Sequence, residues 1–388
     1  MGGVNQDKMT ESANKRVLIL RPDHLGDLIL FSGTLKHFRK LWPSAQITLS
    51  VHKFGLELFA HCPHVDNLIS YEKLSGEVCG EGTLARRLRL HGEYALGARL
   101  RRNIPGIVPR IYRSDIALLP RLAPSFDEHL CMELLPARQK IGISGNTTNQ
   151  TVEIDLDSRK HYSSQMDASQ LAWNCPELEV SGLFLSFLGA TVSTPEIWPE
   201  FWTTSEDRAQ ANSLMPKTPD RITLAISPGF SNPAKELSAT WFAEVISLLT
   251  FRNLRIVLLG SGADLAVCAD VAKAIELMGL GIPILNLAGQ TSVRQMIECI
   301  KQCDLVLSQD TATLHVATAL RKPVAGILGG GHFGRFYPWG DRRLARVVHQ
   351  PMDCYGCNWH CRHDTVRCIQ EISPNMAAKE LNELRTLV

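Results

Sequence analysis

The stretch RPDHLGDLIL places an acid, Asp27, directly after Gly26, where an apolar run gives way to an amphipathic one. The run RVLIL (16–20) is typical of a buried strand, and Pro22 and Asp23 favour a strand-to-helix turn. Asp27 is therefore predicted in the first turn of a helix, at the carboxyl edge of the first strand. A carboxylate there can act as a general base, although an isolated acid in a first helical turn more often serves the helix dipole.

The loop SPGFSNPAKELSATW (227–241) follows a strand-like run and carries Lys235 before a helix predicted to start near Ser238. Ser227 and Gly229 open this loop, whose glycine, asparagine and prolines expose backbone N–H groups. Such a loop can aim one ammonium group at a phosphate. A solvated surface lysine is the competing interpretation, and the loop by itself does not separate the two.

Two further motifs predict backbone that can hold a ligand. In SQDTATLHVATAL (308–320) a strand is predicted to end at Ser308, and Asp310 and Thr311 open a helix with Asp310 as its N-cap. The amide groups at the start of that helix could hold a diphosphate. The segment LGGGHFGRFYPWG (328–340) is glycine-rich after the last predicted strand, so its backbone can approach a ligand closely.

The elements that must position these residues follow a strand-helix rhythm. Short apolar runs alternate with longer amphipathic ones in two series, the first at 16–20, 46–51, 67–71, 115–120 and 139–144, the second at 221–229, 255–262, 283–289, 303–310 and 322–331. This alternation predicts an α/β fold with two Rossmann-like, doubly wound parallel sheets. The ligands of such sheets bind beyond the carboxyl ends of the strands, which predicts a site in a cleft that both halves face.

A chain of 388 residues suits two domains, each large enough for a core of its own. The segment 188–208 has two prolines and no apolar period, so it is the predicted linker between domains at 1–195 and 206–388. The polar segment 145–168 is predicted to be a mobile loop. The segment 84–113 is rich in arginine and suits either an anionic ligand or a solvated basic helix face.

Composition excludes some classes of protein. Lys plus Arg number 41 against 39 Asp plus Glu, so no global charge points to a nucleic-acid partner. The polar N-terminus lacks the apolar region of a signal peptide, and no run is long enough to span a bilayer, which predicts a cytoplasmic protein. Seven of the eleven cysteines are scattered through ordinary segments, which argues against a secreted disulfide framework.

The remaining four cysteines are clustered in MDCYGCNWHCRHDTVRC (352–368). Cys354, Cys357, Cys361 and Cys368 follow the pattern C-x2-C-x3-C-x6-C. Four soft ligands in a short span can close a tetrahedral site around zinc or iron. A pair of disulfides and four unrelated buried thiols are the competing interpretations. Whether the metal is zinc or iron, the cluster is expected to hold the C-terminal tail in place rather than to form the catalytic centre.

In the order of these motifs the chain resembles the ADP-heptose:lipopolysaccharide heptosyltransferases, glycosyltransferase family 9, which are inverting enzymes of the GT-B fold. The resemblance extends from Arg16 to about Pro374 and is weakest over 72–114 and 145–170. It implies an N-terminal domain for the acceptor and a C-terminal domain for the nucleotide-sugar. It also implies that Asp27 is the general base for the acceptor hydroxyl, on the domain opposite Lys235.

The resemblance further implies a donor site in the second half of the chain. Lys235 would contact the donor phosphate, and Asp310, Thr311 and His315 match a D-T-G-x-x-H motif whose glycine is here Ala312. Adenine and ribose would lie near Gly260, Ser261 and Asp264, although Asp264 equally suits a helix cap. Transfer would need no metal, because a helix N-terminus and Lys235 together supply the positive potential.

Some family members carry a similar cysteine cluster, including those that modify autotransporter proteins, where it holds iron. This implies a metal at the cluster. The acceptor could then be either an anionic lipopolysaccharide core or a protein. Contact with the inner face of the inner membrane and a homo-oligomer are compatible with both acceptors. The chain departs from the family pattern at Gly33, Ala312 and Glu236-Leu237, where proline, glycine and tryptophan-proline are usual. These departures leave open the donor sugar and a non-catalytic nucleotide-binding scaffold.

Overall fold

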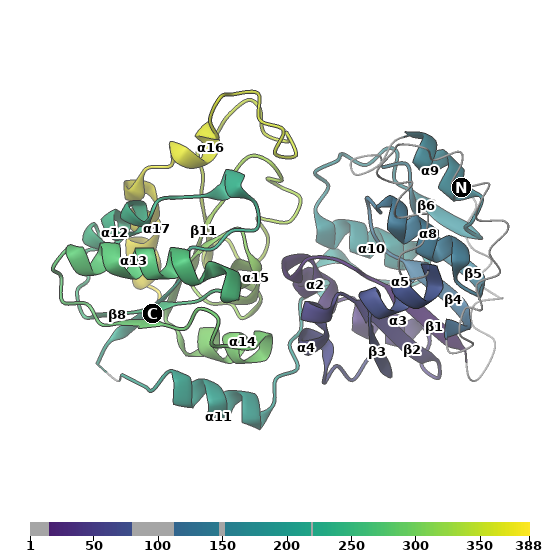
Figure 1. The fold of residues 1–388 in the computed structure, drawn as a ribbon, viewed down its shortest axis with the longest axis horizontal. Coiled ribbons are helices and arrows are strands. Elements are labelled where there is room, and N and C mark those ends of the chain that lie inside the picture. The colour runs from purple at the N-terminus through teal and green to yellow at the C-terminus, as the bar shows by residue number, and fades with distance from the viewer. Residues whose placement is uncertain (1–14, 80–111, 147–151, 219) are drawn as a thin grey trace. The chain divides into compact units, whose positions relative to one another are not determined.

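The computed structural model describes residues 15–79, 112–146, 152–218 and 220–388 (Figure 1). The chain divides into two compact units. The described residues within Met1–His24, Gly33–Trp173 and Leu178–Ile197 form the first unit, and those within Leu25–Ser32, Asn174–Glu177 and Trp198–Val388 form the second. The short helix that carries Asp27 is therefore grouped with the second unit, together with Lys235. The expectation that these two residues lie on different halves is not met.

The sheet of the first unit has six parallel strands in the order β3-β2-β1-β4-β5-β6. The strands are β1 (Arg16–Leu20), β2 (Gln46–Val51), β3 (Asn67–Ser70), β4 (Ser114–Leu119), β5 (Ala137–Ser144) and β6 (Ser164–Asp167). The helices are α3 (Leu35–Leu41), η1 (Lys53–Gly55), α4 (Leu56–Phe59), α5 (Tyr71–Cys79), α8 (Phe126–Leu134), α9 (Val152–Arg159), α10 (Glu177–Phe187) and η3 (Thr194–Glu196).

The sheet of the second unit repeats this topology in the order β12-β11-β10-β7-β8-β9. Its strands are β7 (Ile222–Ser227), β8 (Leu254–Leu258), β9 (Ile284–Asn286), β10 (Leu305–Gln309), β11 (Val324–Ile327) and β12 (Ala345–Val348). Its helices are α2 (Leu25–Ser32), α11 (Ser205–Leu214), η4 (Pro233–Lys235), α12 (Ala239–Ser247), η5 (Gly262–Asp264), α13 (Leu265–Leu277), α14 (Val293–Gln302), α15 (Ala312–Ala319), α16 (Arg367–Gln370) and α17 (Pro374–Arg385).

In each sheet the direction of winding reverses after the third strand, so the two strands on either side of the reversal are central neighbours. Right-handed crossovers then place the helices of the two directions on opposite faces. In the second unit α12 packs against α13 and α17, while α14 packs against α11 and α15. Ligands of doubly wound sheets bind beyond the carboxyl ends of the strands at the reversal, which here are β7 and β10.

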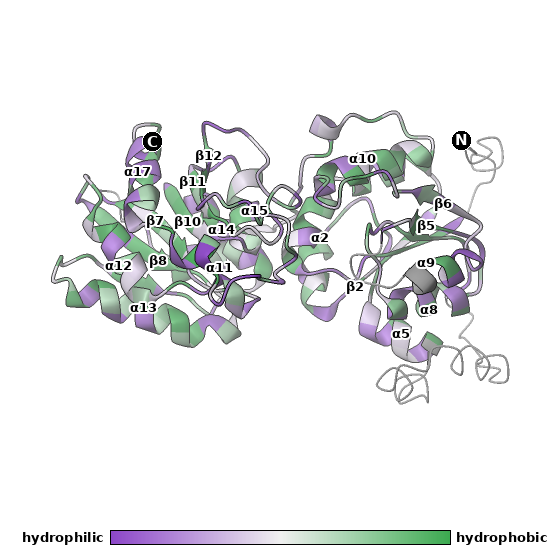
Figure 2. Ribbon diagram, turned by 90° about the horizontal axis from the view of Figure 1, so that it is seen from above, coloured by the Kyte–Doolittle hydropathy of each residue, from purple (hydrophilic) through white to green (hydrophobic). Residues whose placement is uncertain are grey.

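Both sheets are apolar because their strands are buried on two faces. Residues of β7, β8 and β10 are almost completely buried, and the hydropathy colouring is mostly green around β7 and β8 (Figure 2). One core of the second unit joins these strands to α12, α13 and α17 and extends to Cys368 and Ile369. Near-continuous apolar runs of this kind are what the sequence predicted for parallel strands, and the fold class is confirmed.

Several local predictions need correction. The amphipathic stretch after the first strand, which carries Asp27, forms two helices, α2 and α3, separated at Gly33-Thr34. The predicted loop 145–168 contains the helix α9 and the strand β6. Asp155 explains why so polar a helix forms, because its buried carboxylate accepts hydrogen bonds from Gly145 N and from Arg159. The arginine-rich segment lies outside the described residues, except Tyr112 and Arg113.

Among the residues that the structure describes, none of the helices has the length and apolar character needed to cross a membrane.

Candidate active site

The two central strands of the second sheet bring Lys235 and Asp310 together. Ser227 and Ser308 are register partners at the carboxyl ends of β7 and β10. Beyond them, Lys235 Nζ lies 2.9 Å from Asp310 Oδ2 and 3.3 Å from the Asp310 carbonyl oxygen. Lys235 is only 7% exposed, so it is not the solvated surface lysine that the sequence left open. Two loops that are far apart in the sequence thus form one charged site.

The loop that carries Lys235 is shaped by its own residues. The Asn232 side chain accepts a hydrogen bond from the Ala234 amide at 3.0 Å, and Pro233 occupies the first position of η4. Both features favour a helical turn directly before the lysine. Two of the three ammonium N–H groups go to Asp310, and within the described chain the third has no hydrogen-bond acceptor. That N–H is available for a ligand.

Asp310 forms an ion pair with Lys235 and does not cap the helix α15. Burial opposes its ionisation, but the charge of Lys235 and the hydrogen bond from Lys235 prevail and lower the pKa of its carboxyl group. The N-cap of α15 is Thr311, not Asp310 as predicted, and no side chain caps this helix through Thr311. The amide groups of its first turn, which begins at Ala312, therefore keep their capacity to bind an anion.

His315 lies inside the unit, on α15. The Trp339 indole donates a hydrogen bond to its Nδ1 at 3.1 Å and stacks on it with the ring planes 10° apart. Burial lowers the pKa of His315 to about 4, with Asp310 opposing and Lys235 adding to the effect. The imidazole is thus neutral, and because Nδ1 accepts, its proton is on Nε2. Sequence reasoning placed His315 at the donor site but did not anticipate its aromatic surroundings.

The His315 ring also determines how closely α2 can approach. A methyl group on Gly26 would lie 3.0 Å from His315 Cδ2, which is tighter than ordinary contact, so the glycine permits the packing of α2 against α15. Asp27 follows in the first turn of α2 and is half-buried, as its position in the sequence predicted. At the other end of α2, Ser32 Oγ accepts a hydrogen bond from the Glu200 amide at 2.9 Å. The helix is therefore held at both ends.

The residues predicted to surround adenine and ribose form a tight cap. Asp264 Oδ2 accepts hydrogen bonds from the Ser261 amide and the Ser261 hydroxyl, each at 2.7 Å. Side chains on Gly229 or Gly260 would collide with Asp264, at 2.2 Å and 2.7 Å. Ser261 is the N-cap of η5 and Asp264 is the third residue of its capping box, while at the start of α13 the Asp264 side chain makes no cap bond. The glycines are explained by close packing on Asp264. A role of Gly260 and Ser261 toward a nucleotide stays a prediction.

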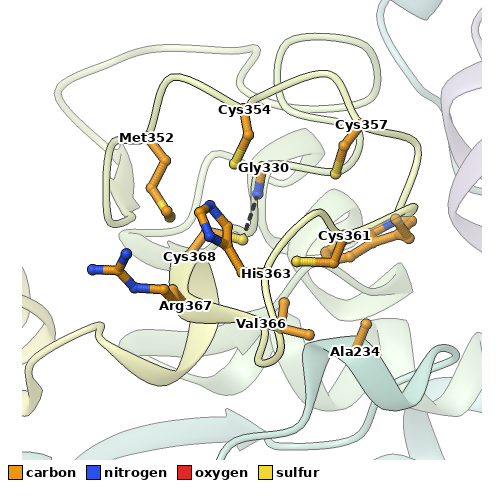
Figure 3. A pocket seen from close by; sticks show the side chains of 11 residues that line it. Ala234, Gly330, Met352, Cys354, Cys357, Cys361, His363, Val366, Arg367 and Cys368 are labelled. Atoms are coloured by element: carbon orange, nitrogen blue, oxygen red, sulfur yellow. Dashed lines mark hydrogen bonds between the residues drawn. The ribbon is translucent and has the colours of Figure 1, made fainter.

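The four clustered cysteines line one pocket (Figure 3). Cys354, Cys357, Cys361 and Cys368 surround it together with His363 and other residues of the same loop. The Gly330 amide donates a hydrogen bond to Cys368 Sγ at 3.3 Å. Burial raises the pKa of the Cys368 thiol, the Gly330 bond opposes this, and the other three cysteines add to the increase. No disulfide joins these four residues.

The donor set suits a metal, although the arrangement is not that of a formed site. Thiolates select zinc, copper(I) and iron, and an N–H···S bond such as that to Cys368 is typical of thiolate ligands. In the described residues, however, no three His, Cys, Asp or Glu side chains are arranged so that they could hold a metal ion. The cysteines supply the right atoms around one pocket, and a metal would have to draw them together.

The glycine-rich loop (328–340) packs against the segment 352–368, which carries the four clustered cysteines and is called the cysteine loop below. A methyl group on Gly329 or Gly331 would lie 2.6 Å or 2.4 Å from the Trp359 indole, and one on Gly330 would lie 2.3 Å from Tyr355. Main-chain hydrogen bonds run from Gly356 N to Gly330 O and from Asn358 N to Gly331 O. The sequence explained these glycines by the approach of a ligand, whereas in the structure aromatic side chains of the cysteine loop occupy the space beside them.

The first unit carries a charged network at its own point of reversal. Arg21 follows β1 and donates to the carbonyl oxygen of Pro120, which follows β4, and it also pairs with Asp23. Arg121 joins Asp23 to Glu128. Burial raises the pKa of Glu128, with Arg121 opposing and Asp23 adding to the effect. Sequence reasoning missed this network, although charged residues directly after two predicted strands were a signal for it.

Comparison with known proteins agrees with this arrangement. Two doubly wound parallel sheets are the architecture of the GT-B glycosyltransferases. Residues 134–359, more than half of the chain, match the model of glycosyltransferase family 9 (heptosyltransferase). The chain belongs to this family, and the predicted enzyme class is confirmed.

The curated relatives are distant. Lipooligosaccharide heptosyltransferase 2 of Campylobacter jejuni is 26% identical over 45% of this chain, and the match spans only 55% of that relative's length. Lipooligosaccharide heptosyltransferase 2 of Haemophilus ducreyi is 23% identical over 79% of this chain and 81% of its own length.

Solved structures support the fold. ADP-heptose lps heptosyltransferase II of Escherichia coli superimposes with a TM-score of 0.67 at 19% identity, covering 96% of this chain and 99% of that one. TibC of enterotoxigenic E. coli H10407, described as an iron-containing dodecameric glycosyltransferase, gives a TM-score of 0.53 at 15% identity, covering 96% and 77%.

His315 predicts how stability depends on pH. Its pKa is about 4 in the folded protein against a reference of 6.5, so between these values the unfolded chain binds more protons. Stability should fall as the pH drops from 6.5 to about 4, by on the order of 1–3 kcal/mol from this residue. His315→Gln keeps an acceptor for Trp339 without titrating and should flatten the profile, measured by thermal unfolding across this range. The exposed His61→Gln is the control, and an unchanged slope in His315→Gln would contradict the assignment.

Proposed function

We propose that the protein transfers a heptose from ADP-heptose to a hydroxyl group of the lipopolysaccharide core, with inversion at the anomeric carbon. One observation carries this proposal: Lys235 is buried beside the uncapped N-terminus of α15, paired with Asp310, and keeps one N–H for a ligand. An ammonium and a helix N-terminus at one point suit a diphosphate. The names of the relatives support heptose as the sugar and lipooligosaccharide or lipopolysaccharide as the acceptor.

In the proposed mechanism Asp27 removes the proton of the acceptor hydroxyl while its oxygen attacks the anomeric carbon. The bond from that carbon to the β-phosphate oxygen breaks, and ADP leaves with the electron pair. Attack from the face opposite the leaving group inverts the configuration. Lys235 and the first amide groups of α15 stabilise the negative charge that develops on the diphosphate.

The position of α2 supports Asp27 in this role. Its helix is packed on α15 through Gly26 and His315, the same helix whose N-terminus would hold the diphosphate. The candidate base and the candidate phosphate site are thus tied to one rigid element. An orientation fixed in this way supplies much of the advantage of a transfer enzyme. An activity of this kind would act in the cytoplasm, at the inner face of the inner membrane.

Lys235→Ala tests the donor site. Removing the ammonium should weaken ADP binding by about 10- to 100-fold, because one charge-assisted hydrogen bond and its attraction to the phosphates are lost. Calorimetric titration with ADP, GDP and UDP measures this and ranks the nucleotide bases. Lys273→Ala, an exposed lysine on α13, is the matched control. Equal ADP affinity in Lys235→Ala and wild type would refute the assignment, and absence of nucleotide binding altogether would refute the proposed donor site.

Asp27→Asn tests the base. The amide cannot accept the proton, so kcat should fall by roughly 100- to 10,000-fold while ADP affinity stays within about twofold. ADP release from ADP-heptose in the presence of heptose-deficient lipopolysaccharide core measures the turnover. The control is Asp270→Asn, an exposed acid on α13. Full turnover in Asp27→Asn would assign the base elsewhere.

We also propose that the four clustered cysteines bind iron or zinc as a structural site. Their convergence on one pocket and the N–H···S bond to Cys368 support this, as does the iron-containing relative TibC. When bound, the metal would tie the cysteine loop together and take no part in the transfer. That the protein forms a homo-oligomer stays a separate prediction.

The metal content of the purified protein tests this site. Elemental analysis should find about one equivalent of iron or zinc per chain for a mononuclear four-thiolate site. Cys361→Ser should lose most of that metal, whereas Cys268→Ser, a buried thiol on α13, should retain it. Wild-type protein without iron or zinc, or equal content in both variants, would leave the cysteines as free thiols.

A further inference from the structure

The cysteine loop reaches the phosphate site through one side chain. Trp359 lies between Cys357 and Cys361 in the sequence, and the Lys235 ammonium stands over its indole, 5.3 Å from the ring centroid. A cation within about 6 Å of a tryptophan face is attracted by the ring quadrupole, and the attraction strengthens when the cation is desolvated. Lys235 is 7% exposed, so this contact belongs to the stronger kind.

Trp359 is held in place from several sides. Its indole packs on Gly329 and Gly331, which have no side chains to obstruct it. The indole N–H donates to His332 Nδ1 at 3.4 Å, while His332 Nε2 lies 2.6 Å from Asn358 Oδ1. These bonds agree on one neutral tautomer, in which Nε2 carries the proton and donates to Asn358. Burial lowers the pKa of His332, which favours that neutral form.

The backbone at this point is also unusual. Asn358 and Trp359 have positive φ angles of 48° and 63°. Asparagine tolerates this left-handed region, but a bulky residue such as tryptophan rarely adopts it. Residues in such conformations persist only where their surroundings hold them, and they cluster at sites where a side chain must be aimed. Here the side chain so placed is the Trp359 indole, which lies against the Lys235 ammonium.

We infer that Trp359 is a positioning residue for Lys235, and that through it the conformation of the cysteine loop sets the affinity of the protein for the donor diphosphate. The indole face restrains the ammonium without taking a hydrogen bond from it, which leaves one N–H for a phosphate oxygen. Trp359 does not touch the reacting atoms in this account. The inference rests on the proposed role of Lys235 at the donor site.

The test is a double-mutant cycle on ADP binding by the full chain. Trp359→Ala should weaken ADP binding by about 3- to 30-fold, the range expected for a cation–π contact. Trp359→Phe keeps a weaker aromatic face and should recover part of the affinity, whereas Trp359→Leu keeps apolar bulk alone and should not. His360→Ala, an exposed neighbour in the loop, should bind ADP as wild type does.

The decisive comparison is made in a Lys235→Ala background. If Trp359 acts through the lysine, Trp359→Ala should change ADP affinity there by less than twofold. If its role is only to support the fold of the loop, it should weaken binding equally in both backgrounds, and the inference is overturned. It is also overturned if Lys235→Ala weakens binding and Trp359→Ala does not. No effect of Lys235→Ala itself would instead refute the proposed donor site.

Discussion

A buried ion pair between Lys235 and Asp310 is the interaction on which the rest of the candidate site depends. Taking an ammonium and a carboxylate out of water is costly, and the cost is offset only when the two meet with good geometry. Here they meet because parallel strands β7 and β10 are neighbours and end at the same edge. The pair joins the loop after β7 to the start of α15, so these two segments cannot move independently without exposing an uncompensated charge.

This constraint makes α15 the organising element of the second unit. Its N-terminus lies at the ion pair, and one turn further His315 forms the surface on which Gly26 and α2 pack. Trp339 fixes the imidazole from the other side. A charged histidine could not remain so buried beside Lys235, and its neutral state is what allows aromatic rings and a helix to close around it. The neutral state of His315 and the packing of Gly26 against it therefore depend on each other.

The sequence predicted most strands because parallel strands buried on both faces appear as continuous apolar runs. It missed β6 and β12, since SQMD is polar and ARVV is short and is interrupted by Arg346. Asp27, Lys235 and Asp310 were found because each lies where a strand gives way to a helix. The pairing of Lys235 with Asp310 could not be read in this way, because strand order depends on how distant segments pack.

The proposed role of Trp359 could not be predicted from the sequence either, because its contacts are with residues distant along the chain. In the sequence it stands among cysteines, whose spacing draws attention to a metal, while its partners Lys235 and Gly331 lie far away along the chain. Physically, an aromatic face suits the position better than a second carboxylate would. Asp310 already neutralises the ammonium, and a further acid would bind its last N–H and repel a diphosphate. A tryptophan stabilises the cation without taking a hydrogen bond from that N–H. The cysteine loop can thus support the phosphate site without competing for it.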